Sequence, residues 1–243
     1  MKNNDAGWLS DGKRQAWFAL QQALDYHFAD PRLLGSALCH RSFANENSGL
    51  GLVDNERLEF LGDAVLDLVI AQCLVRGYVG EREGELTRVR AEVVAEPSLA
   101  LIARQLSLGQ CLLLGRGELR SGGRSKTSLL ADALEALFGA IFVEAGYQRA
   151  AEVILPLFEP LVQRAFDHAG SDFKTRLQEH IQANKCPLPV YRLVEESGPD
   201  HQPSYQVEVA VAGKVWGAGC GPTKKKAEQA AARAALAELE KRA

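Results

Sequence analysis

The chain has 243 residues, with 28 basic and 31 acidic residues, a formal net charge of −3 and 47% hydrophobic residues. It is long enough to bury a sizeable core and to form two domains. The absence of any run of eighteen apolar residues excludes a membrane span, and no apolar secretion segment is apparent. The five cysteines are scattered without a CxxC pair, which predicts reduced thiols in a cytoplasmic protein without a zinc site.

The charge is unevenly distributed along the chain. Residues 171–243 hold 11 basic and 9 acidic residues, a net charge of +2, which leaves 17 basic and 22 acidic residues in the preceding part. The front of the chain is therefore acidic and the end is mildly basic. Such an end can bind phosphate locally although the whole chain is acidic.

The first predicted elements are two amphipathic helices. Residues 11–27 carry apolar side chains at helical spacing. Asp30 suits an N-cap and Pro31 the first turn of the second helix, which we expect to end near residues 40–43. We expect His40, at this end, to have a capping or loop role rather than a catalytic one.

The next stretch, residues 55–76, is apolar around most of a helix but carries Glu56, Glu59, Asp63 and Asp67. At about 100° per residue these acids form a stripe about 80° wide, on which no Lys or Arg lies. Like charges at this spacing repel, and partly buried unpaired carboxylates are costly. The opposing charge must come from another element or from a metal ion.

Two shorter helices, after Gly84 and from Pro97, lead to a glycine-rich loop over residues 114–125. Backbone N–H groups of such a loop, placed before a helix, can hold phosphate. Arg120 and Arg124 are either phosphate contacts or solvated loop charges. The loop is not a Walker A motif, because the residues after it lack the required glycine and spacing.

A second apolar helix with an acidic face is predicted over residues 128–143, with Ser128 as its N-cap. Asp132 and Glu135 lie three residues apart and so share one face. Packed against the first acidic helix, this face predicts a single acidic pocket. Oxygen ligands favour Mg²⁺ or Mn²⁺ over zinc; buried salt bridges to Arg or Lys from other helices are the alternative. A last helix, over residues 147–166, closes the domain.

Residues 167–171 are polar and contain glycine, which predicts a linker. The rest of the chain predicts a helix, three strands and a helix, at residues 173–184, 190–195, 205–211, 214–219 and 223–241. Three consecutive lysines, residues 224–226, open the last helix. Cations there oppose the helix dipole, so their placement suits a phosphate backbone better than it suits stability.

These motifs resemble the bacterial ribonuclease III family along nearly the whole chain. Residues 55–63 and 131–137 are similar to the two acidic motifs of that family, and residues 174–179 and 217–231 to a double-stranded RNA-binding domain. The resemblance implies an α + α/β two-domain fold. Its domains are an all-α endonuclease domain at residues 1–166, the linker at 167–171, and an α-β-β-β-α double-stranded RNA-binding domain at 172–243.

The resemblance also implies an activity. A Mg²⁺-dependent endoribonuclease, with Mn²⁺ as a substitute, would hydrolyse phosphodiester bonds in double-stranded RNA to leave 5′-phosphate and 3′-hydroxyl ends. The family processes ribosomal RNA precursors, messenger RNA and other structured transcripts in the cytoplasm. It acts as a homodimer, which implies that Phe60 inserts into the partner subunit, although packing of Phe60 within one chain is the alternative.

The implied site residues follow from the matched motifs. The metal ligands would be Glu59, Asp63, Asp132 and Glu135, of which Asp63 and Glu135 are also the expected catalytic residues. Glu56 and Glu83 would lie outside the metal ligands or near the approaching RNA. Asp67 has no family role and is expected to be structural.

The implied RNA contacts divide between two kinds of group. Lys224 and Lys225 would bind phosphates, while Thr175, Gln178, Glu179 and His201 would approach 2′-hydroxyl groups. A non-enzymatic binder of structured RNA is the competing hypothesis, but it would not need all four acids. A small-molecule metal hydrolase leaves residues 172–241 unexplained.

Overall fold

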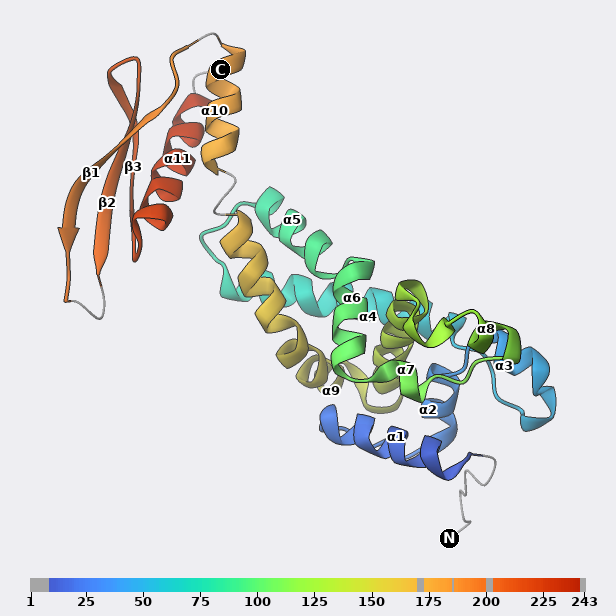
Figure 1. Cartoon of the computed structure of the whole chain (residues 1–243). Helices are drawn as coiled ribbons and strands as arrows, with labels where there is room; N and C mark the ends of the chain where they lie inside the picture. The colour runs from blue at the N-terminus through green and yellow to red at the C-terminus, as the bar shows by residue number, and fades with distance from the viewer. Residues whose placement is uncertain (1–8, 170–172, 185, 200–202, 241–243) are drawn as a thin grey trace. The chain divides into compact units, whose positions relative to one another are not determined.

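The computed structural model describes residues 9–169, 173–184, 186–199 and 203–240 (Figure 1). The chain forms two compact units, Met1–Val162 and Gln163–Ala243. No helix among the described residues combines the length and the apolar character needed to cross a membrane.

The N-terminal unit is built from helices, as the sequence predicts. In chain order these are α1 (Asp11–Ala23), α2 (Pro31–Ala37), α3 (Arg41–Glu46), η1 (Ser48–Leu50), α4 (Glu56–Gly77), α5 (Glu83–Val93), α6 (Glu96–Gln105), α7 (Leu108–Cys111), α8 (Arg116–Arg120), η2 (Gly123–Ser125) and α9 (Thr127–Ala169). Helix α1 ends four residues before the predicted boundary at residue 27, and Asp25 adopts a positive φ of 47°.

The helix predicted from Asp30 to residues 40–43 is two helices in the structure. Asp30 does cap α2, because its Oδ1 accepts the Arg32 N–H at 2.9 Å. Backbone bonds to Leu113 then interrupt the helix: the Leu113 N–H donates to the Leu38 carbonyl at 2.8 Å, and the His40 N–H donates to the Leu113 carbonyl at 3.0 Å. His40 then caps α3, as expected, by accepting the Ser42 N–H.

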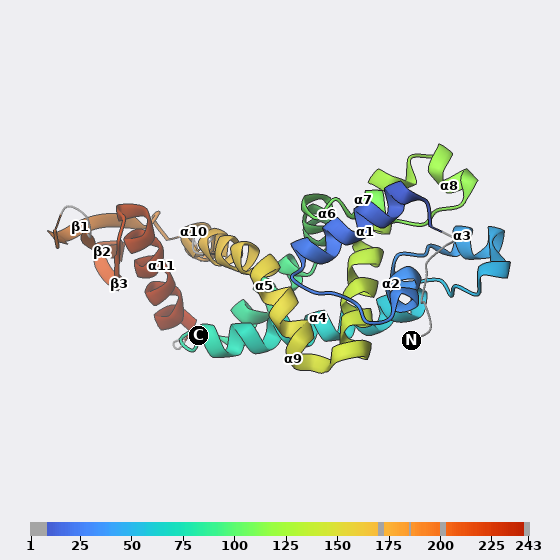
Figure 2. The same ribbon diagram turned by 90° about the horizontal axis from the view of Figure 1, so that it is seen from below.

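Helices α4 and α9 form the centre of the unit and touch backbone to backbone (Figure 2). A Cβ atom on Gly62 of α4 would lie 1.8 Å from the carbonyl oxygen of Glu135 in α9. A Cβ atom on Gly139 of α9 would lie 2.2 Å from the carbonyl oxygen of Leu58 in α4. Only glycine fits at these two positions, so this pair sets the distance between the two acidic helices.

Helix α9 differs from its prediction at both ends. It begins at Thr127, so the prediction that Ser128 is the N-cap is wrong, and Ser128 lies in the first turn. Gly146, with φ 76° and ψ −178°, separates two helical segments at the predicted break between residues 143 and 147. The second segment continues to Ala169, so residues 167–169 of the predicted linker are helical.

The C-terminal unit has the predicted α-β-β-β-α order. Its elements are α10 (Phe173–Ala183), β1 (Val190–Ser197), β2 (Ser204–Val211), β3 (Lys214–Gly221) and α11 (Lys224–Glu240). The strands form one antiparallel sheet in the order β1-β2-β3, and both helices cover the same face of it (Figure 1). Ala212 and Gly213 have φ of 51° and 80°, which makes the two-residue turn between β2 and β3.

The core of this unit combines alternating valines with a helix face of small residues. Val207 and Val209 of β2 are buried, and so are Ala231 and Ala235 of α11. A Cβ atom on Gly217 of β3 would lie 2.4 Å from the Ala231 carbonyl oxygen. The strand glycine and the alanine face together let α11 lie close to the sheet, so its N-terminal lysines occupy a fixed place.

Candidate functional site

Three carboxylates from α4 and α9 converge in the N-terminal unit. Carboxylate oxygens of Glu59, Asp132 and Glu135 all lie within 4.8 Å of one another, so the three side chains could hold a metal ion. All three are half-buried. We call these three residues the carboxylate cluster.

The fourth predicted metal ligand, Asp63, does not belong to this group. It is exposed and lies one turn after Glu59 on α4. Its negative charge still raises the pKa of both Glu59 and Glu135, so it faces the same region. The structure thus brings three of the four predicted ligands together and leaves the fourth at their edge.

The pKa values of the cluster show uncompensated negative charge. Burial is the largest cause that raises the pKa of Glu135 to about 8, and the charges of Asp63, Glu59, Asp132 and Asp67 raise it further. Burial, followed by neighbouring acids, also raises the pKa of Glu59 and of Asp132. Such shifts are typical of carboxylates that lack a counter-charge.

Ion pairs explain two of the other acids. Glu56 lies 3.7 Å from Arg41, and Asp67 lies 3.8 Å from Arg90. Within the described part of the chain, no Lys or Arg forms an ion pair with the carboxylate cluster or with Asp63. Glu56 and Asp67 therefore have ion-pair partners on other helices, at exposed or half-exposed positions, whereas the cluster has none among these residues.

Glu83 lies at the start of α5, where its carboxylate accepts a hydrogen bond from Thr87 Oγ1 at 2.7 Å. It is exposed and is not part of the carboxylate cluster. Glu56 and Glu83 thus lie outside the group of three.

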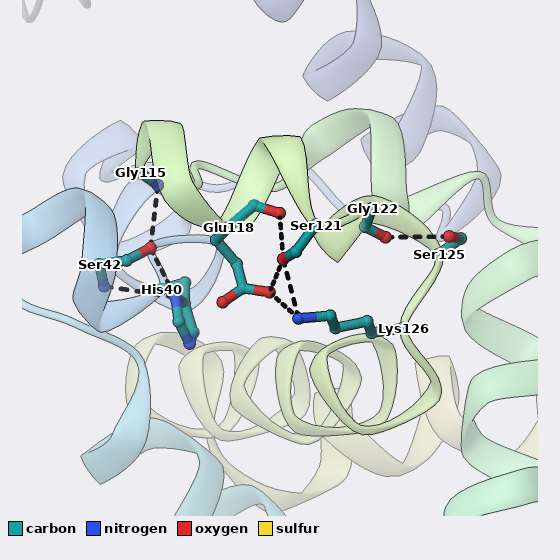
Figure 3. A network of polar contacts seen from close by, with 8 residues as sticks. All are labelled: His40, Ser42, Gly115, Glu118, Ser121, Gly122, Ser125 and Lys126. Carbon is teal, nitrogen blue, oxygen red and sulfur yellow. Dashed lines mark hydrogen bonds and ion pairs between the residues drawn. The ribbon is translucent and has the colours of Figure 1, made fainter.

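The glycine-rich loop before α9 is folded by its own polar contacts. Figure 3 shows Lys126, the residue before α9, paired with the Glu118 carboxylate and bonded to Ser121 Oγ at 3.0 Å. Ser42 Oγ accepts the Gly115 N–H at 2.9 Å and contacts His40 Nδ1 at 2.8 Å. These contacts hold the loop against α3, next to the helix that carries Asp132 and Glu135.

Sequence reasoning missed three contributions to this site. Gly62 and Gly139 allow the two acidic helices to touch. The only sequence signal for this contact is the spacing of each glycine from the acids on its own helix. After burial, the charge of Glu96 at the start of α6 contributes most to raising the pKa of Asp132. No local sequence signal connects Glu96 to the cluster, because the two are brought together only by folding.

The predicted RNA-contacting residues of the C-terminal unit lie on two helices. Thr175, Gln178 and Glu179 are exposed on α10, and Lys224 and Lys225 are exposed in the first turn of α11. His201 lies outside the described residues, so its predicted role has no structural counterpart here.

Lys224 contacts the sheet as well as solvent. Its ammonium lies 3.6 Å from Glu196 of β1 and 5.5 Å from the centroid of the Tyr205 ring. Thr223 Oγ1 accepts the Lys226 N–H at 3.2 Å and so satisfies one free donor of the first turn.

An apolar stripe lies on the exposed side of α4. Phe60 is 82% exposed, Leu68 56% and Val75 63%. At about 100° per residue these side chains, with Ala64 between them, fall within about 80° of one another. Exposed contiguous apolar surface of this kind marks an interaction site more often than a monomer surface.

Comparisons with known proteins agree with both units. A family model described as Ribonuclease-III-like matches residues 30–161, and one described as double-stranded RNA binding motif matches residues 173–239. "Ribonuclease 3" of Syntrophotalea carbinolica is 49% identical over 222 residues, covering 91% of this chain and 96% of that protein. "Ribonuclease 3" of Thermobifida fusca is 50% identical over 206 residues, covering 84% and 85%.

The solved nuclease domain of Campylobacter jejuni ribonuclease III matches with a TM-score of 0.55 and 46% identity, covering 58% of this chain and 95% of that domain. That structure concerns a region involved in dimer formation of the Campylobacter domain. The helical fold and its acids thus define a nuclease domain, and the second unit is a double-stranded RNA-binding domain. The chain belongs to the ribonuclease III family of endoribonucleases.

Proposed function

We propose that this endoribonuclease cuts double-stranded RNA with the help of Mg²⁺, for which Mn²⁺ can substitute. The observation that supports this most is the convergence of Glu59, Asp132 and Glu135 without an ion pair to Lys or Arg among the described residues. An all-oxygen donor set with uncompensated charge fits a hard divalent ion. Bound there, such an ion would neutralise the scissile phosphate and lower the pKa of a water molecule.

The residues of the chain have separate tasks in this proposal. Glu59, Asp63, Asp132 and Glu135 hold the ion, with Asp63 completing the set from the edge of the cluster. Glu135, the most perturbed of these acids, must lose its proton to become a ligand, since its pKa is about 8 without a metal. Glu56 and Glu83 lie outside the set of metal ligands. There they orient the approaching RNA or a water molecule at the metal site.

The second domain binds the RNA duplex. Lys224 and Lys225 contact phosphates across a groove, and Thr175, Gln178, Glu179 and His201 approach 2′-hydroxyl groups. The domain boundaries we propose are residues 1–166 for the nuclease, 167–171 for the linker and 172–243 for the RNA-binding domain.

The working unit we propose is a homodimer, since cutting both strands requires two centres. The apolar stripe of Phe60, Ala64, Leu68 and Val75 supports this, because it would be buried when two α4 helices meet about a two-fold axis. The Campylobacter nuclease domain, which is similar to this one, has a region involved in dimer formation. The products would carry 5′-phosphate and 3′-hydroxyl ends, and the substrates would include ribosomal RNA precursors and other structured transcripts in the cytoplasm.

The experiment is to incubate the full chain with a long RNA duplex in Mg²⁺, in Mn²⁺ or in EDTA, and to analyse the ends of the products. We expect cleavage with either metal and none in EDTA, with 5′-phosphate and 3′-hydroxyl ends. Cleavage that persists in EDTA would contradict the metal proposal, and 3′-phosphate ends would contradict the proposed attack by water.

A further inference from the structure

One residue of the RNA-binding domain, Lys174, joins three of its elements. Its Nζ donates to Glu228 Oε2 of α11 at 2.7 Å, and its backbone N–H donates to Gln229 Oε1 at 3.1 Å. Its ammonium also lies 4.4 Å from the centroid of the Tyr191 ring on β1. The first turn of α10 is thus attached both to α11 and to the sheet.

The attachment is partly withdrawn from water. The Lys174 and Glu228 side chains are 35% and 31% exposed, and Gln229 is buried. The hydroxyl oxygen of Tyr191 beside them is also buried. Charge-assisted hydrogen bonds in such places are screened less than those on an open surface.

The attachment lies beside both groups of proposed RNA contacts. Thr175 is the next residue along α10, and Lys225 lies one helical turn before Glu228 on α11. A-form RNA presents its 2′-hydroxyl groups and its phosphates at fixed separations. A domain that contacts both must hold its two helices at a matching separation. The Lys174–Glu228 ion pair, with the hydrogen bond from the Lys174 N–H to Gln229 beside it, links the two helices at this point.

We propose that Lys174 and Glu228 are positioning residues for RNA binding: their ion pair sets the separation between the RNA-contacting groups of α10 and those of α11. Lys174, although it is a cation in an RNA-binding helix, is then not a phosphate ligand. This inference rests on the proposed RNA contacts of the two helices.

The sign of one substitution separates this proposal from simple electrostatics. Glu228 is a negative charge on the helix that carries the proposed phosphate contacts, so electrostatics alone predicts tighter binding to RNA when that charge is removed. The positioning proposal predicts weaker binding, because α10 loses its anchor. Glu228→Gln keeps the shape of the side chain and removes only the charge.

Glu208 provides a matched control. It lies on β2 between Val207 and Val209, whose side chains face the core, so its own side chain is on the opposite face of the sheet. Glu208→Gln therefore removes one negative charge from the same domain without touching α10 or α11. It measures the electrostatic part of the effect alone.

The experiment measures the Kd of the full chain for a short RNA duplex by fluorescence anisotropy in EDTA, with a gel to verify that the duplex stays intact. Relative to Glu208→Gln, we expect Glu228→Gln to bind about threefold or more weakly, and Lys174→Gln similarly. The double variant should bind no more weakly than the weaker single variant, because both changes break one interaction. The charge-swapped pair Lys174→Glu with Glu228→Lys should regain most of the affinity.

Three results would overturn the proposal. If Glu228→Gln binds as tightly as Glu208→Gln, or if the effects of Lys174→Gln and Glu228→Gln simply add, the two residues act independently and the positioning role is wrong, while the RNA-binding function stands. If the unchanged chain does not bind the duplex, both proposals fail together. Thermal unfolding of each variant verifies that the assays compare folded proteins. The charge-swapped pair tests the ion pair between residues 174 and 228 in a domain whose net charge is unchanged.

Discussion

The carboxylate cluster and the lysine end of α11 both gather like charges, but they do so in opposite surroundings. Glu59, Asp132 and Glu135 are half-buried, and burial followed by the charges of neighbouring acids raises their pKa values. Lys224 and Lys225 are exposed. Charges held partly out of water require a compact counter-ion. Exposed charges are stable in water without a bound polyanion, and salt screens them.

The two regions also differ in how the chain assembles them. The lysines are consecutive in the sequence, so one helix start is enough to gather them. The cluster combines side chains about 75 residues apart and depends on the backbone contact between α4 and α9 at Gly62 and Gly139. The carboxylate cluster therefore depends on long-range packing, while local sequence is enough to place the two lysines side by side.

The largest expected effect concerns Glu135. Glu135→Gln should lower the rate of cleavage on the order of a thousandfold, because the ion would lose a charged ligand and with it several kcal/mol of transition-state stabilisation. Binding to duplex RNA in EDTA should stay nearly unchanged. Glu152→Gln, at an exposed acid of the same helix that pairs with Arg149, is the control and should leave both quantities unchanged. An equal loss of binding and cleavage in Glu135→Gln would contradict the division between a catalytic cluster and a separate RNA-binding region.

The next effect tests the contact between the acidic helices. Gly62→Ala should reduce cleavage strongly and lower the free energy of unfolding by about 1–3 kcal/mol, because its Cβ would overlap the Glu135 carbonyl oxygen and force α4 and α9 apart. Gly84→Ala is the control, since a Cβ there meets nothing within 4 Å. Chemical denaturation and a cleavage assay measure the two quantities. A Gly62→Ala protein as active and stable as Gly84→Ala would show that the close approach is not required.

A smaller effect is expected at the lysine end. Replacing both Lys224 and Lys225 by Ala should weaken duplex binding about tenfold and reduce the salt dependence of log K by about two units, about one for each lost phosphate contact. Lys214→Ala is the control, because Lys214 lies at the start of β3, about 23 Å along the strand from Gly221, which precedes the first turn of α11. An unchanged salt slope in the double variant would count against phosphate contacts by these lysines.

A last prediction is a pH dependence of stability in the metal-free protein. The pKa of Glu135 is raised to about 8 in the folded state, above its ordinary value near 4.3, so the folded state holds a proton that the unfolded state has lost. Stability should therefore fall as pH rises from about 4.5 to about 8. Glu135→Gln should flatten this slope in thermal melts in EDTA. If stability falls as steeply with pH in the variant as in the unchanged chain, the pH dependence comes from groups other than Glu135.

Much of this architecture was predictable because its signals are local. The acid spacing at Glu59, Asp132 and Glu135 and the strand alternation around Val207 and Val209 each follow from the period of one element. The order of the C-terminal elements is confirmed on this basis. Asp30 as a helix cap is confirmed for the same reason.

Three of the misses share a long-range cause. The predicted second helix is divided because residues 38–40 bond to Leu113, some 75 residues away in the chain. The position of Asp63 at the edge of the cluster depends on the rotation of α4 against α9, which no helical pattern fixes. Glu96 comes from a helix whose own sequence carries no sign of the site.

Titration of the metal-free chain with Mn²⁺, followed by calorimetry, tests the central claim most directly. If the carboxylate cluster is a metal site, the chain should bind Mn²⁺ with release of protons near pH 7, and Glu135→Gln should lose most of this binding while Glu152→Gln keeps it. Binding of equal strength in all three proteins, or no binding in the unchanged chain, would contradict the account.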